Sequence, residues 1–242
     1  MKSILLKIYT GWVLFVFTFF MILFLPGIVL PAFFGPRAVS VTYFFMKLWS
    51  WLFSKLTFIR YQIINREKIE KGKAFIYVSN HTSFLDLPGI AMTIRGQFRP
   101  LAKKELLKIP VFGWVTRATC VVVDRDNGPS RKKSIDYLKR ILSYGINILI
   151  FPEGTQNRTP EIMQPFKEGA FRIAIDANQT IQPLVVIGAG KLMPPKKAKV
   201  YPGTIKIVVG DAIDVSGYTQ ESIGELKDNT FAVLKKMIEQ NS

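Results

Sequence analysis

The stretch of sequence that decides the fold is Phe75-Ile76-Tyr77-Val78-Ser79-Asn80-His81-Thr82-Ser83-Phe84-Leu85-Asp86. Its beginning is mostly apolar, aromatic or β-branched and predicts a buried strand, Phe75–Ser79. Polar residues follow, and the segment near Pro88–Ile94 then has the pattern of a helix. A buried strand that leads directly into a helix is the repeating unit of α/β proteins.

The same alternation of strand and helix continues towards the end of the chain. Four more apolar segments predict strands at Cys120–Asp124, Ile146–Phe151, Ile181–Ile187 and Ile205–Val209. The further helices that we predict are Ser130–Ser143, Glu168–Asp176 and Gln220–Glu239. Apolar strands separated by helices favour an α/β fold with a mixed sheet that helices flank on both faces.

The first 60 residues differ from the rest, because Phe and Trp gather there. The run Ile8–Pro36 has no charged residue, and a helix of this length, at about 1.5 Å per residue, exceeds a hydrocarbon core of about 30 Å. Lys2 and Lys7 precede the run, as in a signal peptide, but the run is too long for a typical signal core and no small-x-small cleavage site follows it. We expect Pro26, Gly27 and Pro31 to bend or interrupt this helix.

A second apolar and aromatic segment, Val39–Ile59, carries Lys47 and Lys55 and predicts an interfacial helix rather than a clean span. Positive residues flank both segments, so the positive-inside rule sets no orientation. Two helices that enter and leave on one side fit these flanks, and one span followed by a surface helix fits almost as well. We therefore divide the chain into an N-terminal two-helix membrane-anchoring motif, residues 1–60, and an α/β domain, residues 61–242.

The charge of the chain indicates an anionic partner. The 33 Lys and Arg residues outnumber the 17 Asp and Glu residues, which gives a formal net charge of +16. Nucleic acid, anionic lipid and a phosphorylated substrate all suit such a charge, and the apolar N-terminus favours lipid. Cys120 and His81 are the only Cys and His residues, so we expect neither an internal disulfide nor a metal site.

His81 and Asp86 are the residues that we expect to carry the chemistry. They follow a buried strand, and active sites of α/β sheets lie at the carboxyl ends of strands. In one continuous helix residues five apart point away from each other, so these two can pair only if the chain turns between them. Either Ser83 or Asp86 can serve as the N-cap of the helix that follows.

A neutral imidazole can take a proton from a hydroxyl group that attacks a carbonyl, and a carboxylate on its other nitrogen fixes the tautomer. The chain has no G-x-S-x-G motif, so we do not expect a covalent acyl-enzyme. In the competing interpretation His81 only caps the helix and Asp86 is a charge at its N-terminus.

The octet Phe151-Pro152-Glu153-Gly154-Thr155-Gln156-Asn157-Arg158 follows another predicted strand. Gly154 and Thr155 can present backbone N–H groups to an anion or an oxyanion. Arg158 offers a planar fork to a phosphate, and Glu153 can accept a hydrogen bond from a glycerol hydroxyl or a nearby lysine. The competing interpretation is an ordinary turn that ends in a solvated arginine.

Together the two motifs resemble the glycerolipid acyltransferase family, whose best-known members are 1-acyl-sn-glycerol-3-phosphate acyltransferases. That family carries N-H-x4-D and, later, F-P-E-G-T-x-x-R. The resemblance extends from about Ala74 to Val186. Its further matches are Lys103-Lys104-Glu105-Leu106 with Pro110-Val111-Phe112-Gly113, then Val122-Val123-Asp124-Arg125, Phe166-Lys167-Glu168-Gly169-Ala170-Phe171 and Ile181-Gln182-Pro183-Leu184-Val185. In the last of these, Gln182 stands where a more apolar residue is common.

The resemblance implies that His81 is the general base and Asp86 its orienting partner. It implies that the acceptor phosphate binds Arg125 and Arg158, with Lys104 as a further cation. The substrate pocket would also contain Glu153, Gly154 and Thr155.

The implied reaction transfers a fatty acyl group from acyl-CoA or acyl carrier protein to the 2-hydroxyl of lysophosphatidic acid, giving phosphatidic acid, with no cofactor. The implied location is the cytoplasmic face of the inner membrane.

Two other functions compete with this one. The same chemistry can serve another lysolipid acceptor, because acceptor choice depends on the shape of the pocket. A non-catalytic membrane protein that binds anionic lipid would explain the charge and the N-terminus, but not the placement of the one histidine in N-H-x4-D. Binding to nucleic acid rests on net charge alone, since the chain has no recognition motif for it.

Overall fold

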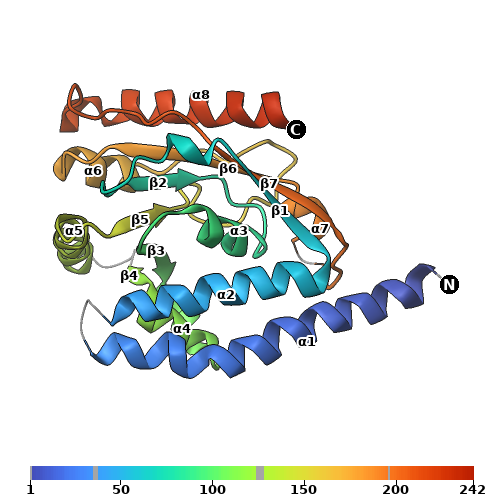
Figure 1. The fold of residues 1–242 in the computed structure, drawn as a ribbon. Helices are drawn as coiled ribbons and strands as arrows, with labels where there is room; N and C mark the ends of the chain where they lie inside the picture. The colour runs from blue at the N-terminus through green and yellow to red at the C-terminus, as the bar shows by residue number, and fades with distance from the viewer. Residues whose placement is uncertain (1, 35–37, 124–127, 196) are drawn as a thin grey trace.

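The structure is a computed structural model that describes residues 2–34, 38–123, 128–195 and 197–242 (Figure 1). The strands are β1 (Ile59–Ile64), β2 (Ile76–Ser79), β3 (Phe98–Lys103), β4 (Val121–Val123), β5 (Asn147–Ile150), β6 (Ile181–Ile187) and β7 (Gly203–Val209). The helices are α1 (Lys2–Val29), α2 (Val39–Thr57), α3 (Asp86–Thr93), α4 (Phe112–Thr119), α5 (Gly128–Ser143), α6 (Gly169–Asp176), α7 (Ala189–Leu192) and α8 (Ile223–Asn241). Short 3-10 helices cover Leu30–Phe33, Arg66–Lys68, Lys104–Lys108 and Gln220–Ser222.

The strands form one mixed sheet in the order β1-β7-β6-β2-β5-β3-β4. Strands β6 and β7 pair in an antiparallel manner, whereas the other neighbours are parallel. Strands β1 and β7 therefore run opposite to the other five. The central strands β2, β5 and β6 are buried along nearly their whole length, as expected for strands with helices on both faces. The predicted fold class is confirmed.

Helices cover the two faces of the sheet as separate layers. Tyr77 and Leu149 belong to a buried cluster with residues of α1 to α4. Their strand neighbours Ile76 and Ile148 belong to a second cluster with α5, α6 and α8. Successive side chains of a strand point to opposite faces, which explains this division. In Figure 1, α8 lies above the sheet and α1 and α2 lie below it.

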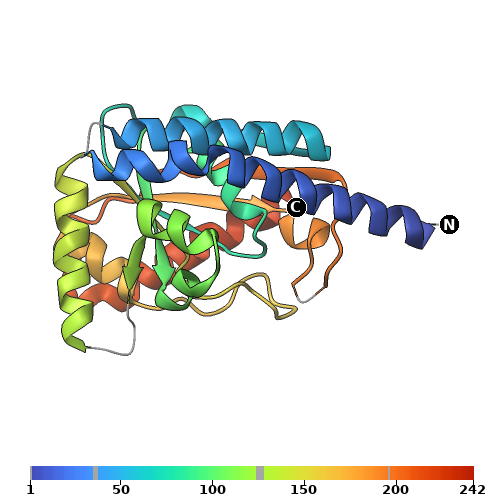
Figure 2. The same ribbon diagram turned by 90° about the horizontal axis from the view of Figure 1, so that it is seen from below.

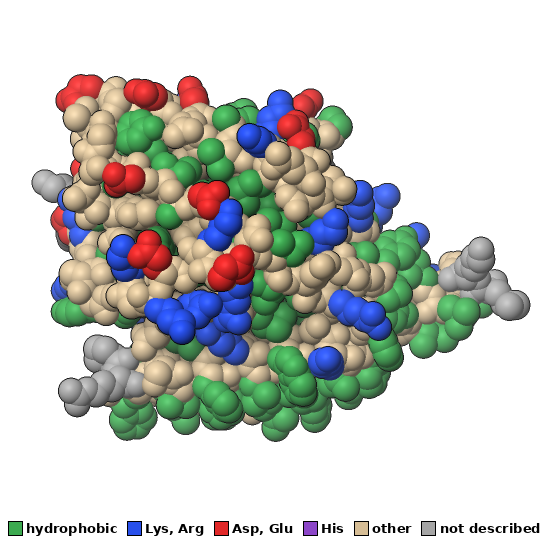
Figure 3. Space-filling model, turned by 45° about the horizontal axis from the view of Figure 1, so that its top comes forward, with side chains coloured by type: hydrophobic (Ala, Val, Ile, Leu, Met, Phe, Trp, Pro, Cys, Tyr) green, Lys and Arg blue, Asp and Glu red, His purple; other side chains and the backbone are tan. Residues whose placement is uncertain are grey.

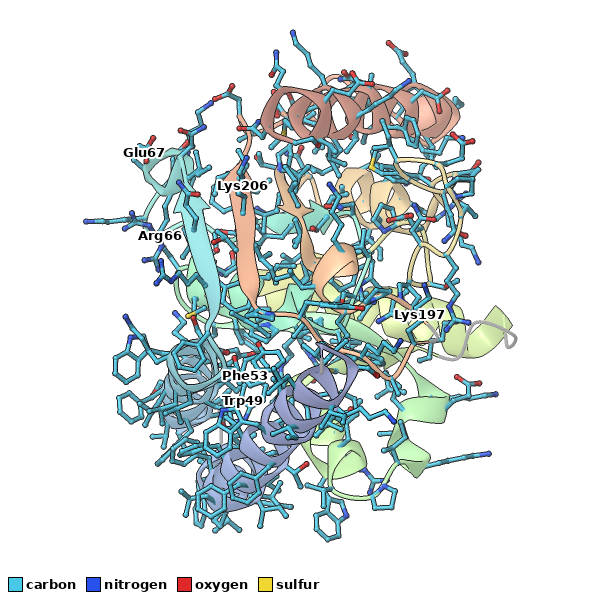
Figure 4. All side chains as sticks on the ribbon, turned by 90° about the vertical axis from the view of Figure 1, so that its right-hand side faces the viewer. Trp49, Phe53, Arg66, Glu67, Lys197 and Lys206 are labelled. Carbon is cyan, nitrogen blue, oxygen red and sulfur yellow. The ribbon has the colours of Figure 1, made fainter. Side chains whose placement is uncertain are left out.

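Helices α1 and α2 lie side by side under the sheet, and the start of α1 extends beyond the rest of the molecule (Figure 2). Their contact is aromatic: the rings of Phe17 and Trp49 meet edge to face at 5.1 Å, and Phe17 also meets Phe53. Figure 4 labels Trp49 and Phe53 on α2. Gly27 allows close packing, because a Cβ there would lie 2.4 Å from the ring of Phe45. Pro26 lies within α1 and does not end the helix.

The surface of α1 is strongly apolar. Among the described helices, the stretch Ser3–Phe33 is long and apolar enough to cross a membrane. Many of its large side chains face outwards, and Phe15 and Phe33 are 57% and 79% exposed. An exposed apolar surface of this size is costly in water, so it indicates that the N-terminal part of the molecule associates with a membrane.

The structure differs from the predicted elements at four places. Strands β1 and β3 and helices α4 and α7 were not among the predicted elements. Strand β3 contains Pro100, which argues against a central strand because proline has no N–H to donate. The strand accommodates it where its partner changes: Phe98 to Pro100 face β5, and Leu101 to Lys103 face β4.

Strand β1 begins almost directly after α2, with only Phe58 between them. The division of the chain into a membrane-anchoring motif, residues 1–60, and an α/β domain, residues 61–242, stays a prediction. One buried cluster contains side chains from both parts.

Candidate active site

The chain turns sharply between β2 and α3, which brings His81 and Asp86 together. The backbone N–H of Asp86 donates to the carbonyl of Ser83 at 3.2 Å, and α3 begins at Asp86 with Leu85 as its N-cap. Neither Ser83 nor Asp86 therefore occupies the N-cap position. The carboxylate of Asp86 instead reaches back over the loop that precedes its own helix.

The Nδ1 atom of His81 lies 2.7 Å from Oδ2 of Asp86. The same oxygen accepts the backbone N–H groups of Thr82 at 2.8 Å and Ser83 at 2.9 Å. The side chain of Asp86 is fully buried, so these donors determine its orientation. A carboxylate held in this way can keep the Nδ1 atom of the imidazole protonated and leave Nε2 as the proton acceptor.

The second motif holds His81 on its other sides. Its backbone N–H donates to Oε1 of Glu153 at 2.8 Å, and its carbonyl accepts the N–H of Asn157 at 2.6 Å. The imidazole ring stacks on Phe151, with ring centres 4.1 Å apart. The two motifs, which lie about 70 residues apart, therefore form one rigid unit around the histidine.

Glu153 connects the two loops from a buried position. Its other oxygen, Oε2, accepts the backbone N–H of Gln164 at 2.8 Å, and the residue is only 3% exposed. Burial raises the pKa of Glu153, while the hydrogen bonds from Gln164 and His81 oppose that rise. The carboxylate lies beside the cleft rather than lining it, with both oxygens engaged by backbone amides.

His81 opens onto a cleft of about 290 Å3 at the carboxyl ends of β2, β3 and β5. This cleft, the candidate catalytic cleft, is lined by His81, Phe84, Leu101, Ala102, Lys103, Leu106, Ile150, Phe151, Gly154, Thr155, Gln156 and Arg158. Nε2 of His81 has no hydrogen-bond partner among the described residues. Arg158 is exposed and lines the cleft, as a cation that meets a substrate phosphate must.

The other two predicted cations differ in position. Lys104 is exposed at the start of the 3-10 helix Lys104–Lys108, and its neighbour Lys103 lines the cleft. Lys103 was not predicted because the strand that ends with it, β3, was not predicted. Arg125 lies outside the described residues.

The turn at Gly154 explains which amide is available for an anion. The N–H of Gly154 donates to the carbonyl of Phe151 at 2.9 Å, so this amide serves the turn itself. Gly154 has a φ of +76°, a conformation that favours glycine. The backbone N–H of Thr155, in contrast, has no acceptor among the described residues, and Thr155 lines the cleft.

Gln156 is a cleft residue for which no role was predicted. Its Nε2 atom is buried and has no hydrogen-bond partner in the described part of the chain. A buried donor without a partner is unfavourable, so such a group facing a cleft indicates a contact that a ligand completes. The only signal in the sequence was its place between Thr155 and Arg158.

Beyond Phe84 the cleft adjoins an apolar cavity of about 400 Å3. This apolar cavity is lined by residues of α1, α3 and the segment Ile109–Phe112, and Phe84 lines both spaces. Polar groups at one end and an apolar space beyond them suit a ligand with a polar head and a long hydrocarbon chain.

The sequence model of the family described as Acyltransferase matches residues 60–187. A 1-acyl-sn-glycerol-3-phosphate acyltransferase from Chlamydomonas reinhardtii is 33% identical over 174 residues, which is 71% of this chain and 52% of the algal protein. A protein of the same name from Haemophilus influenzae is 32% identical over 167 residues, covering 67% of this chain and 68% of that protein. The match therefore spans about half the length of the algal relative.

A solved structure has a similar fold over nearly the whole chain. The crystal structure of the 1-acyl-sn-glycerophosphate (LPA) acyltransferase PlsC from Thermotoga maritima matches with a TM-score of 0.83. The match covers 99% of this chain and 97% of that one at 24% sequence identity. Since it extends over the whole chain, the shared fold includes α1 and α2 as well as the sheet.

Proposed function

Because this chain belongs to the acyltransferase family, we propose that it transfers a fatty acyl group from acyl-CoA or acyl carrier protein to the 2-hydroxyl of 1-acyl-glycerol 3-phosphate, giving phosphatidic acid. The observation that carries the proposal is the His81–Asp86 pair at 2.7 Å, which opens onto a cleft with two cations and an adjoining apolar cavity. This combination fits a phosphorylated acceptor and an apolar acyl chain.

In the proposed mechanism Nε2 of His81 takes the proton of the acceptor hydroxyl as its oxygen attacks the thioester carbonyl. Asp86 stabilises the imidazolium that forms, and it keeps its own negative charge. The tetrahedral intermediate then collapses, the C–S bond breaks, and the imidazolium returns the proton to the leaving thiolate. No covalent acyl-enzyme is needed, because the acceptor supplies the nucleophile.

The remaining cleft residues bind the substrates. The N–H of Thr155 is the proposed donor to the carbonyl oxygen that becomes negative, and Gln156 offers a second donor. Arg158 and Lys103 meet the phosphate of the acceptor, where Lys104 and Arg125 stay as predicted further contacts. Glu153 acts by positioning His81 and is not proposed to touch substrate.

The N-terminal helices hold the cleft at a membrane surface, which we propose to be the cytoplasmic face of the cell membrane. Both substrates carry long apolar chains, so an enzyme seated in the headgroup region reaches them without extracting them into water. The apolar surface of α1 supports this placement. The lipid bilayer is thus a proposed partner, and no nucleic acid is expected.

A panel of acceptors tests the reaction. Purified protein receives radiolabelled acyl-CoA or acyl carrier protein together with lysophosphatidic acid, or with lysolipids that lack the phosphomonoester. We expect the fastest transfer to lysophosphatidic acid, and a preference for another acceptor would overturn this choice. The His81→Ala variant should lose transfer and still bind vesicles. If it keeps full activity, the non-catalytic lipid-binding function becomes the better explanation.

A further inference from the structure

A second polar cavity, of about 460 Å3, lies at the opposite edge of the sheet from the catalytic cleft. Its lining includes Lys73, Arg95 and Asn147, which precede or begin the parallel strands β2, β3 and β5. His81 follows the other end of β2. This basic pocket is completed by Lys47, Arg66, Tyr77 and residues 69–72, 96 and 145. The mechanism proposed above uses none of these residues.

Three cations from separate parts of the chain converge on the basic pocket. Lys47 comes from α2, Arg66 follows β1 and Arg95 follows α3. Among the described residues, none of the three forms an ion pair with a carboxylate. Glu70 also lines the pocket, but it pairs with Lys73 at 2.5 Å. The pocket therefore holds uncompensated positive charge.

The three cations also act on one another. Burial lowers the pKa of Lys47, and the nearby charge of Arg66 lowers it further. Burial lowers the pKa of Arg66, and Arg95 adds to that effect. Positive groups held this close in a partly buried site are unfavourable unless an anion lies between them.

Capping of α3 explains only part of this arrangement. Nζ of Lys47 donates to the carbonyl of Ile94 at 3.1 Å, and Nε of Arg66 donates to that of Thr93 at 3.0 Å. Cations at the carboxyl end of a helix are favourable for this reason alone. Arg95 has no such bond: its Nε is buried and lacks a partner in the described part of the structure.

Tyr77 gives the independent observation that points to a ligand. The residue is fully buried, it lines the pocket, and its hydroxyl has no hydrogen-bond partner within the described ranges. Burial raises the pKa of Tyr77, so the hydroxyl keeps its proton at neutral pH. Two buried donors, on Tyr77 and Arg95, thus lack an acceptor in a site that already carries excess positive charge. An oxyanion would supply what both lack.

The position of the pocket indicates where that anion comes from. On α2, Phe44 and Trp51 lie three residues before and four residues after Lys47, and they are 62% and 51% exposed. Residues at this spacing share one face of a helix, so Lys47 lies between two exposed aromatic side chains. Figure 3 shows a group of Lys and Arg side chains beside the apolar lower edge of the molecule, and Arg66 lies on the same side as α2 in Figure 4. Aromatic and basic residues together are typical of the headgroup level of a bilayer.

We propose that the basic pocket binds the phosphate group of an anionic phospholipid at the membrane surface, as a second lipid site separate from the catalytic cleft. The phosphate oxygens accept from Tyr77, Arg95 and Lys47. The lipid chains lie along the exposed face of α2, beside Phe44 and Trp51.

Vesicle binding by the full-length chain tests the proposal. Flotation compares phosphatidylcholine vesicles with vesicles that also contain phosphatidic acid. We expect Arg95→Gln to lower partitioning into the anionic vesicles about fivefold, the effect of roughly one well-placed cation. Tyr77→Phe should lower it about threefold, the effect of roughly one hydrogen bond. The control Lys236→Gln removes the same charge from α8, on the far side of the sheet from α1 and α2, and should change little (Figure 1).

Three measurements keep the result decisive. Tyr77→Phe in neutral detergent should unfold at the same temperature as the wild type or a higher one, since it removes a buried hydroxyl without a partner. Equal losses in Arg95→Gln and Lys236→Gln would overturn the proposal in favour of unspecific attraction. If inorganic phosphate stabilises the wild type but neither pocket variant, and vesicle binding is unchanged in both, the ligand is a soluble phosphate and the lipid assignment is wrong.

Discussion

Replacing Glu153 by Gln tests whether the link between the two motifs positions His81, the proposed general base. Each oxygen of Glu153 accepts one backbone N–H at 2.8 Å, from His81 and from Gln164. Glutamine has one oxygen and one NH2 group in place of the two oxygens. One of the two backbone N–H groups must therefore face the NH2 group, which is itself a donor. The loss of a charge-assisted hydrogen bond costs about 1.5–3 kcal/mol. Relief from burying a charge offsets part of this cost, which leaves about 2 kcal/mol.

A change of this size is measurable in both stability and rate. For a chain of this length, about 2 kcal/mol corresponds to a decrease in Tm of roughly 4–8 °C. A displacement of His81 by about 1 Å would lower kcat by on the order of 100-fold. The KM values for both substrates should stay within about twofold of the wild type, since Glu153 lies beside the cleft and does not line it.

The assay measures transfer from radiolabelled acyl-CoA to lysophosphatidic acid by the protein in detergent, alongside thermal unfolding. Glu161→Gln is the matched control, because it makes the same chemical change on the same loop at an exposed position. A Glu153→Gln enzyme with unchanged kcat and Tm would refute the reasoning. A lower Tm with unchanged kcat would show that Glu153 supports only the fold.

Four further results are expected. Asp86→Asn should lower kcat about 1000-fold or more with a small change in KM, because the amide cannot hold the tautomer that His81 needs. Gln156→Leu should leave Tm unchanged or raise it and lower kcat/KM about 3- to 10-fold, since its amide lacks a partner until substrate binds. Phe84→Ala joins the cleft to the apolar cavity and should change the rate ratio of long to short acyl donors on the order of tenfold; an unchanged ratio would exclude that cavity as the acyl site. Because burial raises the pKa of Glu153, its stability contribution is fully present below the ordinary value of 4.5 and is lost as pH rises through the higher folded value. The wild type should therefore gain stability relative to Glu153→Gln as pH falls through that window, as thermal unfolding at a series of pH values can measure.

The sequence predicts well those parts of the molecule whose pattern is local. The predicted strands Phe75–Ser79 and Ile181–Ile187 appear within one residue of their predicted bounds. Each is a continuous apolar run that ends at polar residues, so its bounds can be recognised without knowing what it packs against. Strand β3 could not be predicted, since Pro100 is tolerated only where the strand changes partner. Strand β1 was not predicted, because the apolar segment before it was expected to continue as a helix to Ile59.

In the candidate site, too, only the features that depend on a local pattern could be predicted. The pairing of His81 with Asp86 was predicted from a short spacing and a strand end, and the geometry has the turn that this pairing requires. The position of Glu153 could not be predicted, because its partners are the amides of His81 and Gln164, whose proximity depends on the packing of two loops. The same holds for Gln156, whose missing partner is visible only once burial is known.

The junction between α2 and β1 has a consequence for which lipids the enzyme can reach. Only Phe58 separates the helix from the strand, and the hydroxyl of Ser54 donates to the carbonyl of Ile59 across this junction at 2.8 Å. Strand β1 pairs along its whole length with β7, so no flexible linker separates the membrane-facing helices from the sheet. We therefore expect the cleft to keep one height above the bilayer midplane, so that the depth of an acceptor's glycerol hydroxyl would decide whether the proposed enzyme can use it.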